Sequence, residues 1–533
     1  MKPTDFSRLH FFIYGIIRKK TIFEVCMQII ELKMRNIFAI AALLLIAGAC
    51  SNVQNEAENS GLAMSRMYSD GMVLQREIPL VIKGYANPGE TVKVVLDGPF
   101  RTKTRKTKAS ADGKWDVKFA PLKAATGLRL TIEGEGAALV YDNVAAGDVW
   151  VCSGQSNMYF RIWESVDNGE ILADEDLRFF NMEMPFHLSM VKWSDEHLQK
   201  AKDMDFYSPT EWEACDEENV RAFSAIGYHF GRMLRERLNV PIGLICNAVG
   251  GSPTEAWIAR ETLASECPEV LEDWFTNGRL NQWCIEMGKI NLGYPETSVA
   301  NHPFAPTCLY ETGIATMEQF PIKGVVWYQG ESNDFDIPMH EKLFGLLVDG
   351  WRNYWNNPEM PFHFVQLSGL YDRYNWPEFR DSQRKMAEAM PYCEMAVSSD
   401  VADSLDIHPR QKRPVGERLA RLALKYDYGF DIVPSGPAIR KAVVDGDKVV
   451  LEFDFADGLK ASDSQSLRCF EVAGDDWTFV PAEAVVADDK VVLVSGIESP
   501  KYVRYAWQPY TSANLVNGED LPASTFFTTI SEN

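Results

Sequence analysis

Four short apolar segments, each typical of a buried β-strand, are spaced along the middle of the chain. The strands are expected at Asp148–Cys152, Pro241–Cys246, Lys323–Tyr328 and Phe362–Leu367, and helical spacing such as that of Ile226–Leu238 lies between them. Strands that alternate with helices predict a layered α/β core with a mostly parallel sheet. Because ligands bind at the carboxyl ends of strands in such sheets, the polar residues that follow these strands are candidates for a site.

The chain of 533 residues is too long for one hydrophobic core, so two or three domains are expected. Short alternating runs separated by turn residues predict a small β-sandwich over residues 62–145, before the α/β region of 146–430. Alternation returns at Lys448–Phe453 and Lys490–Val494 and predicts a β-rich region over 431–530. The expected architecture is an α/β core flanked by β structure on both sides.

Residues 1–50 have the pattern of an export signal. A basic stretch begins at Lys33, the apolar run Ile37–Ala47 follows, and Met34 is a better candidate start than Met1. The apolar run is too short to span a bilayer comfortably, which favours a signal peptide over a membrane-spanning helix.

Cys50 follows two small residues and resembles the lipidated cysteine of a bacterial lipobox, although Ala47 stands where leucine is commonest. Residues 51–61 are polar and predict a flexible tether. We therefore expect a lipid anchor and a place in the bacterial cell envelope, as a periplasmic or outer-membrane lipoprotein or otherwise as a secreted protein.

The formal net charge of −22 argues against a nucleic-acid partner, because it repels phosphate backbones. It also disfavours an anionic substrate unless a local arginine offsets it, and Arg352, Arg373 and Arg380 are candidates for that role. The eight cysteines beyond residue 50 show no Cys-x-x-Cys pair and no metal-ligand spacing. Scattered buried thiols are expected, and neither a metal nor another cofactor is implied.

Three polar motifs follow strands, and a fourth precedes a probable helix at Val415–Lys425. They are Gly154–Met158, Gly250–Ser252, Gln329–Asn333 and Asp406–Pro409. An acyl-transfer enzyme needs a nucleophile, a base, a group that orients the base, and donors for an oxyanion. These four motifs contain one candidate for each requirement.

Ser156 is the candidate nucleophile because it lies where a strand turns into a helix, with backbone N–H groups nearby. A helix N-cap is the alternative interpretation of this serine. Among eight histidines, His408 is the candidate base, since Asp406 precedes it by two residues and can fix its tautomer; His302 is its rival.

Gly250 and Gly251 have two interpretations. They form a plain turn, or they allow a backbone N–H to approach an oxyanion, an approach that a side chain would obstruct. Gln329 and Asn333 offer amide donors at a strand end, and Glu331 is a possible support for the site.

With these motifs, the sequence resembles the sialate O-acetylesterase family, a branch of the SGNH hydrolases. The resemblance covers about residues 62–530 and is carried by five segments: Val149–Met158, Gly250–Trp257, Trp327–Asn333, Asp406–Pro409 and Val503–Trp507. It implies a flavodoxin-like three-layer α/β/α core with Ser156, Asp406 and His408 as the catalytic triad.

The resemblance also implies an oxyanion hole made by the N–H of Ser156, an N–H of Gly250 or Gly251, and an amide of the third motif. Gln155, Asn157 and Glu331 are expected to support the site. Two departures from the wider SGNH pattern leave alternatives. The acid precedes the histidine by two residues instead of three, so Asp403 rivals Asp406. The third motif is Gln-Gly-Glu-Ser-Asn, so Gln329, which is favoured, competes with Asn333.

The predicted function is that of a serine esterase that removes O-acetyl groups from sugars, most of all from sialic acid, through an acetyl-serine intermediate. One alternative keeps the chemistry and changes the substrate to acetylated xylan or another polysaccharide. The alternative of another class is a non-catalytic carbohydrate-binding lipoprotein, which would have no use for all four motifs.

Overall fold

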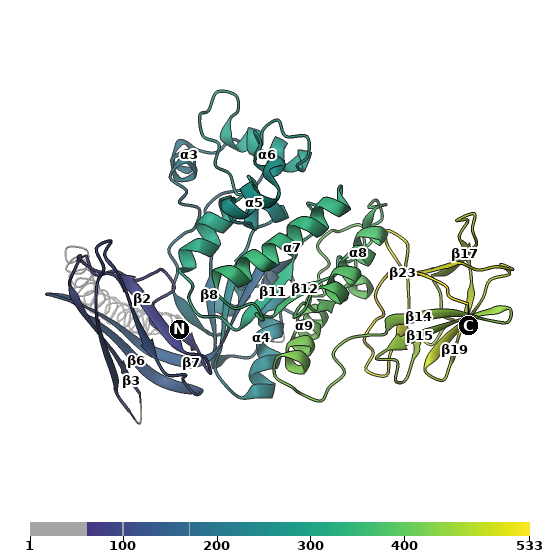
Figure 1. Ribbon diagram of the computed structural model, residues 1–533, viewed down its shortest axis with the longest axis horizontal. Coiled ribbons are helices and arrows are strands. Elements are labelled where there is room, and N and C mark those ends of the chain that lie inside the picture. The colour runs from purple at the N-terminus through teal and green to yellow at the C-terminus, as the bar shows by residue number, and fades with distance from the viewer. Residues whose placement is uncertain (1–60, 99–100, 170, 533) are drawn as a thin grey trace, which may run out of the picture.

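The computed structural model describes residues 61–98, 101–169 and 171–532. The predicted signal peptide, Cys50 and nearly all of the predicted tether lie outside these residues. Figure 1 shows β structure at both ends of an elongated molecule and the α/β region between them. Among the described residues there is no helix both long and apolar enough to cross a membrane.

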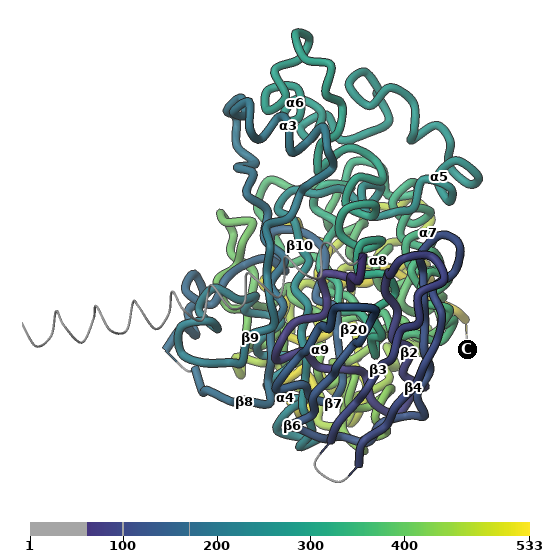
Figure 2. Tube along the Cα trace, turned by 90° about the vertical axis from the view of Figure 1, so that its left-hand side faces the viewer, coloured from purple at the N-terminus to yellow at the C-terminus, as the bar shows by residue number. Residues whose placement is uncertain are grey.

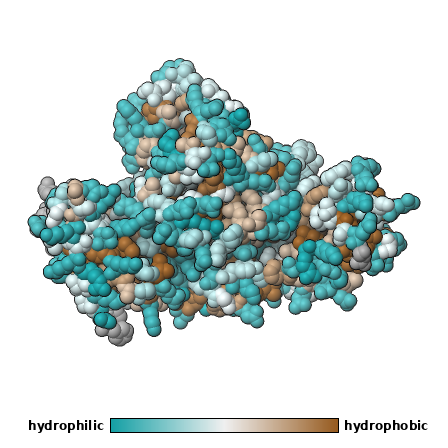
Figure 3. All heavy atoms as spheres, in the orientation of Figure 1, coloured by the Kyte–Doolittle hydropathy of each residue, from teal (hydrophilic) through white to brown (hydrophobic). Residues whose placement is uncertain are grey.

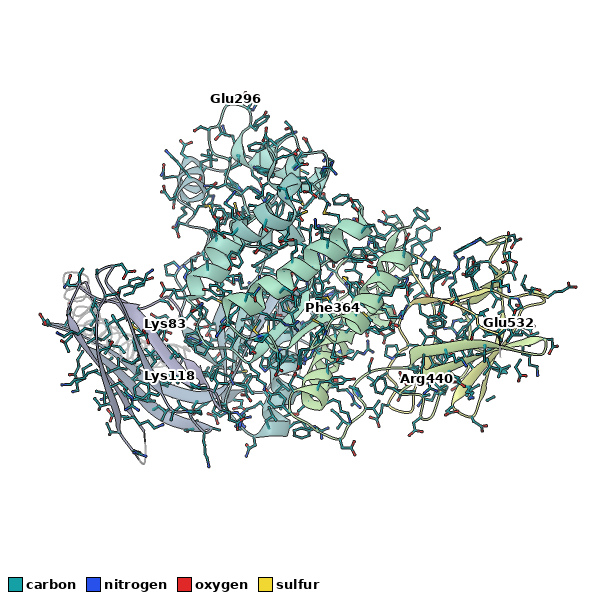
Figure 4. All side chains as sticks on the ribbon, viewed as in Figure 1. Lys83, Lys118, Glu296, Phe364, Arg440 and Glu532 are labelled. Carbon is teal, nitrogen blue, oxygen red and sulfur yellow. The ribbon has the colours of Figure 1, made fainter. Side chains whose placement is uncertain are left out.

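The N-terminal region consists of short strands whose side chains alternate between buried and exposed. β3 pairs with β4 and β6, β2 pairs with β5, and all of these pairs are antiparallel. The strands are β1 (Val73–Gln75), β2 (Leu80–Tyr85), β3 (Thr91–Asp97), β4 (Lys103–Lys108), β5 (Lys114–Phe119) and β6 (Ala125–Glu133). Figure 4 shows Lys83 of β2 and Lys118 of β5 within this region.

A single 17-residue strand, β7 (Ala138–Gly154), connects the N-terminal region to the central sheet. Its first half pairs with β6, and its second half, from Asp148 onward, pairs with strands of the central sheet. A Cβ at Gly147 would lie 1.9 Å from the Pro241 carbonyl oxygen, so this position requires glycine. The two regions are therefore joined through one continuous strand.

The central sheet has the order β13-β12-β11-β7-β10-β8-β9, and every neighbouring pair is parallel except β8 with β9. Its further strands are β8 (Asp174–Asn181), β9 (Trp212–Cys215), β10 (Ile242–Ala248), β11 (Gly324–Tyr328), β12 (Phe362–Val365) and β13 (Met395–Ala396). The mixed α/β architecture with a mostly parallel sheet is thus confirmed.

Helices pack on both faces of this sheet. On one face, Trp150 and Leu244 pack with residues of α4 (Ala225–Leu238) and α9 (Arg413–Tyr426). On the other face, Val151 and Trp327 pack with residues of α7 (Ile337–Tyr354), such as Trp351. The helix α8 (Trp376–Ala389) follows β12. Figure 4 shows Phe364 of β12 at the centre of the molecule, where it is buried.

A helical lobe projects from the sheet and carries α3 (Asp195–Lys202), α5 (Arg260–Glu266) and α6 (Gln282–Leu292). Figure 2 shows α3 and α6 side by side at the far end of this lobe, and Glu296 lies at its tip in Figure 4. The lobe is inserted between strands of the central sheet and supplies one side of the cavity described below.

The C-terminal region is β-rich, as predicted. It has a four-stranded sheet in the order β14-β15-β20-β19, another in the order β18-β17-β21-β23, and the pair β16-β22. Its strands are β14 (Ala438–Asp445), β15 (Lys448–Asp454), β16 (Lys460–Ala461), β17 (Phe470–Ala473), β18 (Val480–Pro481), β19 (Glu483–Ala487), β20 (Lys490–Val494), β21 (Tyr502–Tyr505), β22 (Leu515–Val516) and β23 (Phe526–Thr529).

The buried guanidinium of Arg380, on α8, ties this region to the core. It donates to the carbonyl oxygens of Ala506, Gln508 and Pro509 and to the Thr525 hydroxyl. The face of the molecule seen in Figure 3 is mostly hydrophilic, with small groups of hydrophobic residues scattered over it.

Candidate active site

Ser156 lies where β7 ends and the short helix α2 (Ser156–Tyr159) begins. The backbone turns at Gly154, which has a φ of 127° and whose Cβ would lie 2.2 Å from the Tyr328 carbonyl oxygen. The same oxygen accepts the backbone N–H of Gln155 at 2.9 Å. Contacts with β11 therefore fix the backbone immediately before Ser156.

His408 lies in the loop before α9, and its Nε2 is 2.8 Å from the Ser156 Oγ. Carboxylates shape this loop, since Asp403 accepts the N–H groups of Leu405 and Asp406, and Asp406 accepts the N–H of His408 at 2.9 Å. The Asp406 Oδ1 is 3.7 Å from the His408 Nδ1, which is longer than a hydrogen bond. Asp406 thus holds the backbone of His408 and adds charge beside its ring.

A buried polar network lies behind this pair. The Asn157 amide donates to the Glu331 carboxylate at 2.7 Å and to the Ile407 carbonyl oxygen at 3.0 Å, and the Lys412 ammonium donates to the Asn157 oxygen. Because Asn157 follows Ser156 and Ile407 precedes His408, the amide of Asn157 links the two segments that carry the pair.

Burial is the main influence on charge in this cluster. It lowers the pKa of Lys412 to about 7 and raises the pKa of Glu331. The attraction between these two charged groups opposes both shifts. The pKa of His408 is lowered first by burial and then by the Lys412 charge, while Asp406 and Glu164 oppose the shift. A lowered pKa leaves the imidazole neutral at pH 7, the form that can accept a proton.

The two glycines of the second motif lie beside Ser156. A Cβ at Gly250 would lie 3.6 Å from the Ser156 Cβ, so a larger side chain would enter the space in front of the serine. Within the described part of the chain, neither the Ser156 N–H nor the Gly250 N–H donates to a protein acceptor. Gly251 has a φ of 75° and lies against the Trp283 and Phe304 rings.

The amides of Gln329 and Asn333 are held in a second buried network. Gln329 donates to the Asn333 oxygen at 2.7 Å and accepts the Thr254 hydroxyl at 2.8 Å. Asn333 donates to Glu255 at 3.0 Å and accepts the Thr254 N–H at 2.9 Å. Burial raises the pKa of Glu255. Neither Gln329 nor Asn333 lines the cavity around Ser156.

The cavity around Ser156 has a volume of about 870 Å³, and residues of the loops after the central strands, of the His408 loop and of the helical lobe line it. Ser156, His408, Gly250 and Gly251 are part of its lining. Residues of the helical lobe form much of the rest: Met184, Phe186, His187, Leu188, Gly278, Leu280, Asn281, Gln282 and Trp283.

The rival residues lie elsewhere. His302 is fully buried in the lobe, stacks on Trp193 and Trp274, and has a pKa lowered to about 3 by burial. Arg352 donates to the Met360 and Pro391 carbonyl oxygens, and the role of Arg380 is described above.

Arg373 does line the cavity, with a side chain that is 38% exposed and an Nη1 that is 3.2 Å from the Asp334 carboxylate.

The eight cysteines of the described part of the chain carry free thiols, and all but Cys469 are buried, as predicted. No cluster of three or more metal-ligating side chains occurs among the described residues.

Sequence reasoning missed Lys412 and Trp283. The position of Lys412 four residues after His408, on the same loop-to-helix segment, was an available signal. Trp283 had none, because nothing in its local sequence relates the start of α6 to Ser156.

Known proteins were compared with the chain. A family profile described as a carbohydrate esterase, sialic acid-specific acetylesterase, matches residues 297–425, which include the third motif and His408. The sialate O-acetylesterase of Mus musculus is 27% identical over 492 residues, which cover 84% of this chain and 90% of that protein. The sialate O-acetylesterase of Homo sapiens is 28% identical over 451 residues, or 78% of this chain and 80% of that protein.

A solved structure is similar over almost its full length. The crystal structure of a carbohydrate acetylesterase from Xanthomonas citri has a TM-score of 0.73 and 31% sequence identity, and the match covers 88% of this chain and 99% of that chain. Together with the profile and the animal enzymes, this similarity shows that the chain belongs to the sialic acid-specific acetylesterase family of carbohydrate esterases, and that it is a carboxylic-ester hydrolase.

Proposed function

We propose that this protein is a serine esterase that hydrolyses O-acetyl esters on sugars through an acetyl-serine intermediate. The observation that carries the proposal is the 2.8 Å contact between Ser156 Oγ and His408 Nε2 at the end of the cavity. Family membership supports the ester chemistry, and the contact supports the two residues that perform it.

In the first step, His408 Nε2 takes the Ser156 proton as the serine oxygen attacks the acetyl carbonyl. The resulting tetrahedral oxyanion collapses, the bond to the sugar oxygen breaks, and the sugar leaves with the proton from His408. In the second step, His408 takes a proton from water as the water oxygen attacks the acetyl carbonyl. The bond to Ser156 Oγ then breaks, His408 returns the proton to that oxygen, and acetic acid leaves and ionises to acetate. His408 gives back within each step the proton that it takes, and no cofactor takes part.

The backbone N–H groups of Ser156 and Gly250 are the proposed oxyanion donors, since both adjoin the serine hydroxyl and neither has a protein acceptor among the described residues. Gln329 and Asn333 remain candidates from the sequence, but their amide groups donate to buried acceptors. We assign these two amides to the support of the Gly250–Thr254 loop. Gln155 supports the third motif, because its side chain accepts the Gly330 N–H.

Asp406 is the proposed orienting group. It faces the His408 Nδ1 and accepts the His408 N–H, whereas Asp403 accepts N–H groups within the turn. Because the Asp406 carboxylate is half exposed, it should stabilise the His408 imidazolium less than a buried triad acid does.

We further propose an SGNH-type three-layer core and an N-terminal β-sandwich, supported by the helices on both faces of the sheet and by the alternating strands β2–β6. From the sequence we also propose export and lipidation at Cys50. Metabolic labelling with palmitate, lost in Cys50→Ala, is the test of the anchor.

The proposed sugar is sialic acid, by analogy with the named animal relatives. Arg373 favours this choice, because it places a cation on the wall of the cavity where a carboxylate of the substrate can bind. Acetylated xylan or another polysaccharide is the second candidate, and the large cavity volume favours it.

The test is acetate release by the purified protein from 9-O-acetylated sialic acid and from acetylated xylan. We expect release from at least one of them, and Arg373→Ala should reduce turnover of the sialate more than turnover of the xylan. Release from neither substrate would contradict the proposed function. Equal loss on both substrates in Arg373→Ala would remove the argument for sialate.

A further inference from the structure

The cavity is larger than the reaction at Ser156 requires. Its volume of about 870 Å³ lies near the top of the range of roughly 300–1,000 Å³ for sites that hold drug-sized molecules. An acetyl group and the single sugar ring that carries it fill only part of such a space. The remaining space extends toward α6 of the helical lobe, where Gln282 and Trp283 contribute to the wall.

Trp283 is the most distinctive residue in that part of the wall. Its side chain is 46% exposed, although tryptophan carries a large apolar ring. The ring lies against Gly251, where a Cβ would come within 2.8 Å of it, and is 5.7 Å from the Phe304 ring. Gly251 adjoins Gly250, which lies beside Ser156, so the outer edge of the indole packs on the loop beside the nucleophile and the ring lines the cavity.

A chain of hydrogen bonds holds the backbone of Trp283, at the start of α6, in place relative to the loop beside the nucleophile. The backbone N–H of Trp283 donates to the Asn281 Oδ1 at 2.9 Å, and the Asn281 Nδ2 donates to the Ser332 carbonyl oxygen at 2.7 Å. The Ser332 hydroxyl in turn donates to the Gly251 carbonyl oxygen at 2.9 Å. The start of α6 is therefore attached to the loop beside Ser156 at a fixed distance.

The same network presents a second exposed aromatic side chain. Phe335 is 47% exposed, lines the cavity, and comes three residues after Ser332. Trp283 and Phe335 are thus two half-exposed aromatic residues from separate elements, and both belong to the wall of the cavity that contains Ser156. The C–H face of a pyranose ring is apolar, and its contact with such a wall removes apolar surface from water.

We propose that Trp283 forms a stacking platform for a second sugar ring, attached to the ring that carries the acetyl group. This inference rests on the proposed function and names a preference for acetylated oligosaccharides and glycans over acetylated monosaccharides. Phe335 bounds the same subsite. Trp283 positions the substrate and takes no part in proton transfer.

The experiment compares pairs of substrates that differ only in the added sugar. The pairs are 9-O-acetylated sialyllactose with 9-O-acetylated sialic acid, and acetylated xylotriose with acetylated xylose. We expect kcat/KM to be higher for the longer member of the pair that the enzyme uses. In Trp283→Ala this ratio should fall about 10-fold, which corresponds to about 1.4 kcal/mol, mainly through KM. Trp283→Phe should recover most of the ratio.

Trp477→Ala is the matched control, since Trp477 is 55% exposed and lies in the C-terminal region. Its ratio should equal that of the unmodified protein. A ratio that Trp283→Ala leaves unchanged would overturn the proposal.

A binding measurement separates this inference from the esterase assignment. In a Ser156→Ala background, calorimetry should show that sialyllactose or xylotriose binds about 10-fold more weakly when Trp283 is also replaced by alanine. Such weakening, together with no acetate release by the unmodified protein, would support the subsite and contradict the esterase. Turnover with no effect of Trp283 on binding or on the ratio would support the esterase and overturn the subsite.

Discussion

Two sets of polar residues lie near the ends of the central strands, Ser156 with His408 and Gln329 with Asn333. The two sets differ in where their hydrogen-bonding groups point. Ser156 and His408 contact each other at the end of a cavity, and His408 is 37% exposed. Gln329 and Asn333 are almost fully buried, and their amides bond to Thr254 and Glu255. The hydrogen-bonding groups of Ser156 and His408 can still bind a ligand, whereas the amides of Gln329 and Asn333 already bond to groups within the protein.

The comparison teaches that a polar motif at a strand end has two separate uses. One use is chemistry, which needs side chains that are only partly satisfied by the protein. The other is support, which needs buried groups whose partners are all present, because each unpaired buried group costs free energy. Substitutions in the two sets should therefore differ in kind, with losses of rate in the first and losses of stability in the second.

The largest expected effect is that of Ser156→Ala. Removal of the nucleophile should lower kcat by at least about 10⁴-fold, as in other serine hydrolases that lose a member of the catalytic unit. Thermal unfolding should stay within a degree or two of the unmodified protein, because the hydroxyl is only partly buried. Acetate release and a melting curve on the same sample check both parts. Retained turnover would remove Ser156 from the mechanism.

The central strands and the proximity of Ser156 to His408 could be predicted from the sequence, because both leave local signals. Each predicted strand of the central sheet is present, and helix α9 begins two residues before the predicted Val415. Ser156 and His408 lie 252 residues apart, so only their motifs related them. The predicted boundary between residues 145 and 146 falls within β7, which continues through Gly147 because that glycine serves a close backbone approach rather than a turn.

Side-chain direction beyond a strand end could not be predicted. β11 ends at Tyr328, and after it the alternation of a strand no longer fixes which residues share a face. Glu331 and Ser332 line the cavity, while Gln329 and Asn333 turn into the protein. Lys412 was missed for a related reason, because a lysine that is buried and one that is exposed look alike in a sequence.

A smaller loss of rate is expected when Asp406 is changed to asparagine. Replacing a buried triad aspartate lowers kcat by about 10⁴-fold, but Asp406 is half exposed and 3.7 Å from the His408 Nδ1. We expect a decrease in kcat of about 10- to 100-fold. Asparagine keeps an oxygen for the His408 N–H, so the loop should keep its shape. Asp403→Asn is the control; a larger loss there than in Asp406→Asn would exchange their roles.

The sharpest test of the comparison is Gln329→Ala. It removes one of the buried hydrogen-bond partners of the Thr254 hydroxyl and one of those of the Asn333 oxygen, so the free energy of unfolding should fall by about 2 kcal/mol. Chemical denaturation measures this change. The folded fraction should lose less than about 10-fold in kcat. If instead kcat fell by about 10²- to 10³-fold at unchanged stability, Gln329 would be an oxyanion donor and the two sets would not be distinct.

The smallest expected effect is a displacement of the pH profile, and two variants should move it in opposite directions. His408 acts as a base only when neutral, and burial and the Lys412 charge lower its pKa below the ordinary 6.5, so kcat/KM should be lost as the pH falls through a value below 6.5. With a pKa of about 7, Lys412 is charged over that range.

Lys412→Gln removes this positive charge, keeps a donor for Asn157, and should move the acid limb to higher pH. Asp406→Asn removes a negative charge that raises the His408 pKa and should move the limb to lower pH, while Glu164 remains in both variants. Profiles of kcat/KM between pH 4 and 8 distinguish the two shifts. If both variants moved the limb the same way, the limb would report a group other than His408. The buried network of Asn157, Glu331 and Lys412 would then belong with the supporting set and would have no electrostatic share in the reaction.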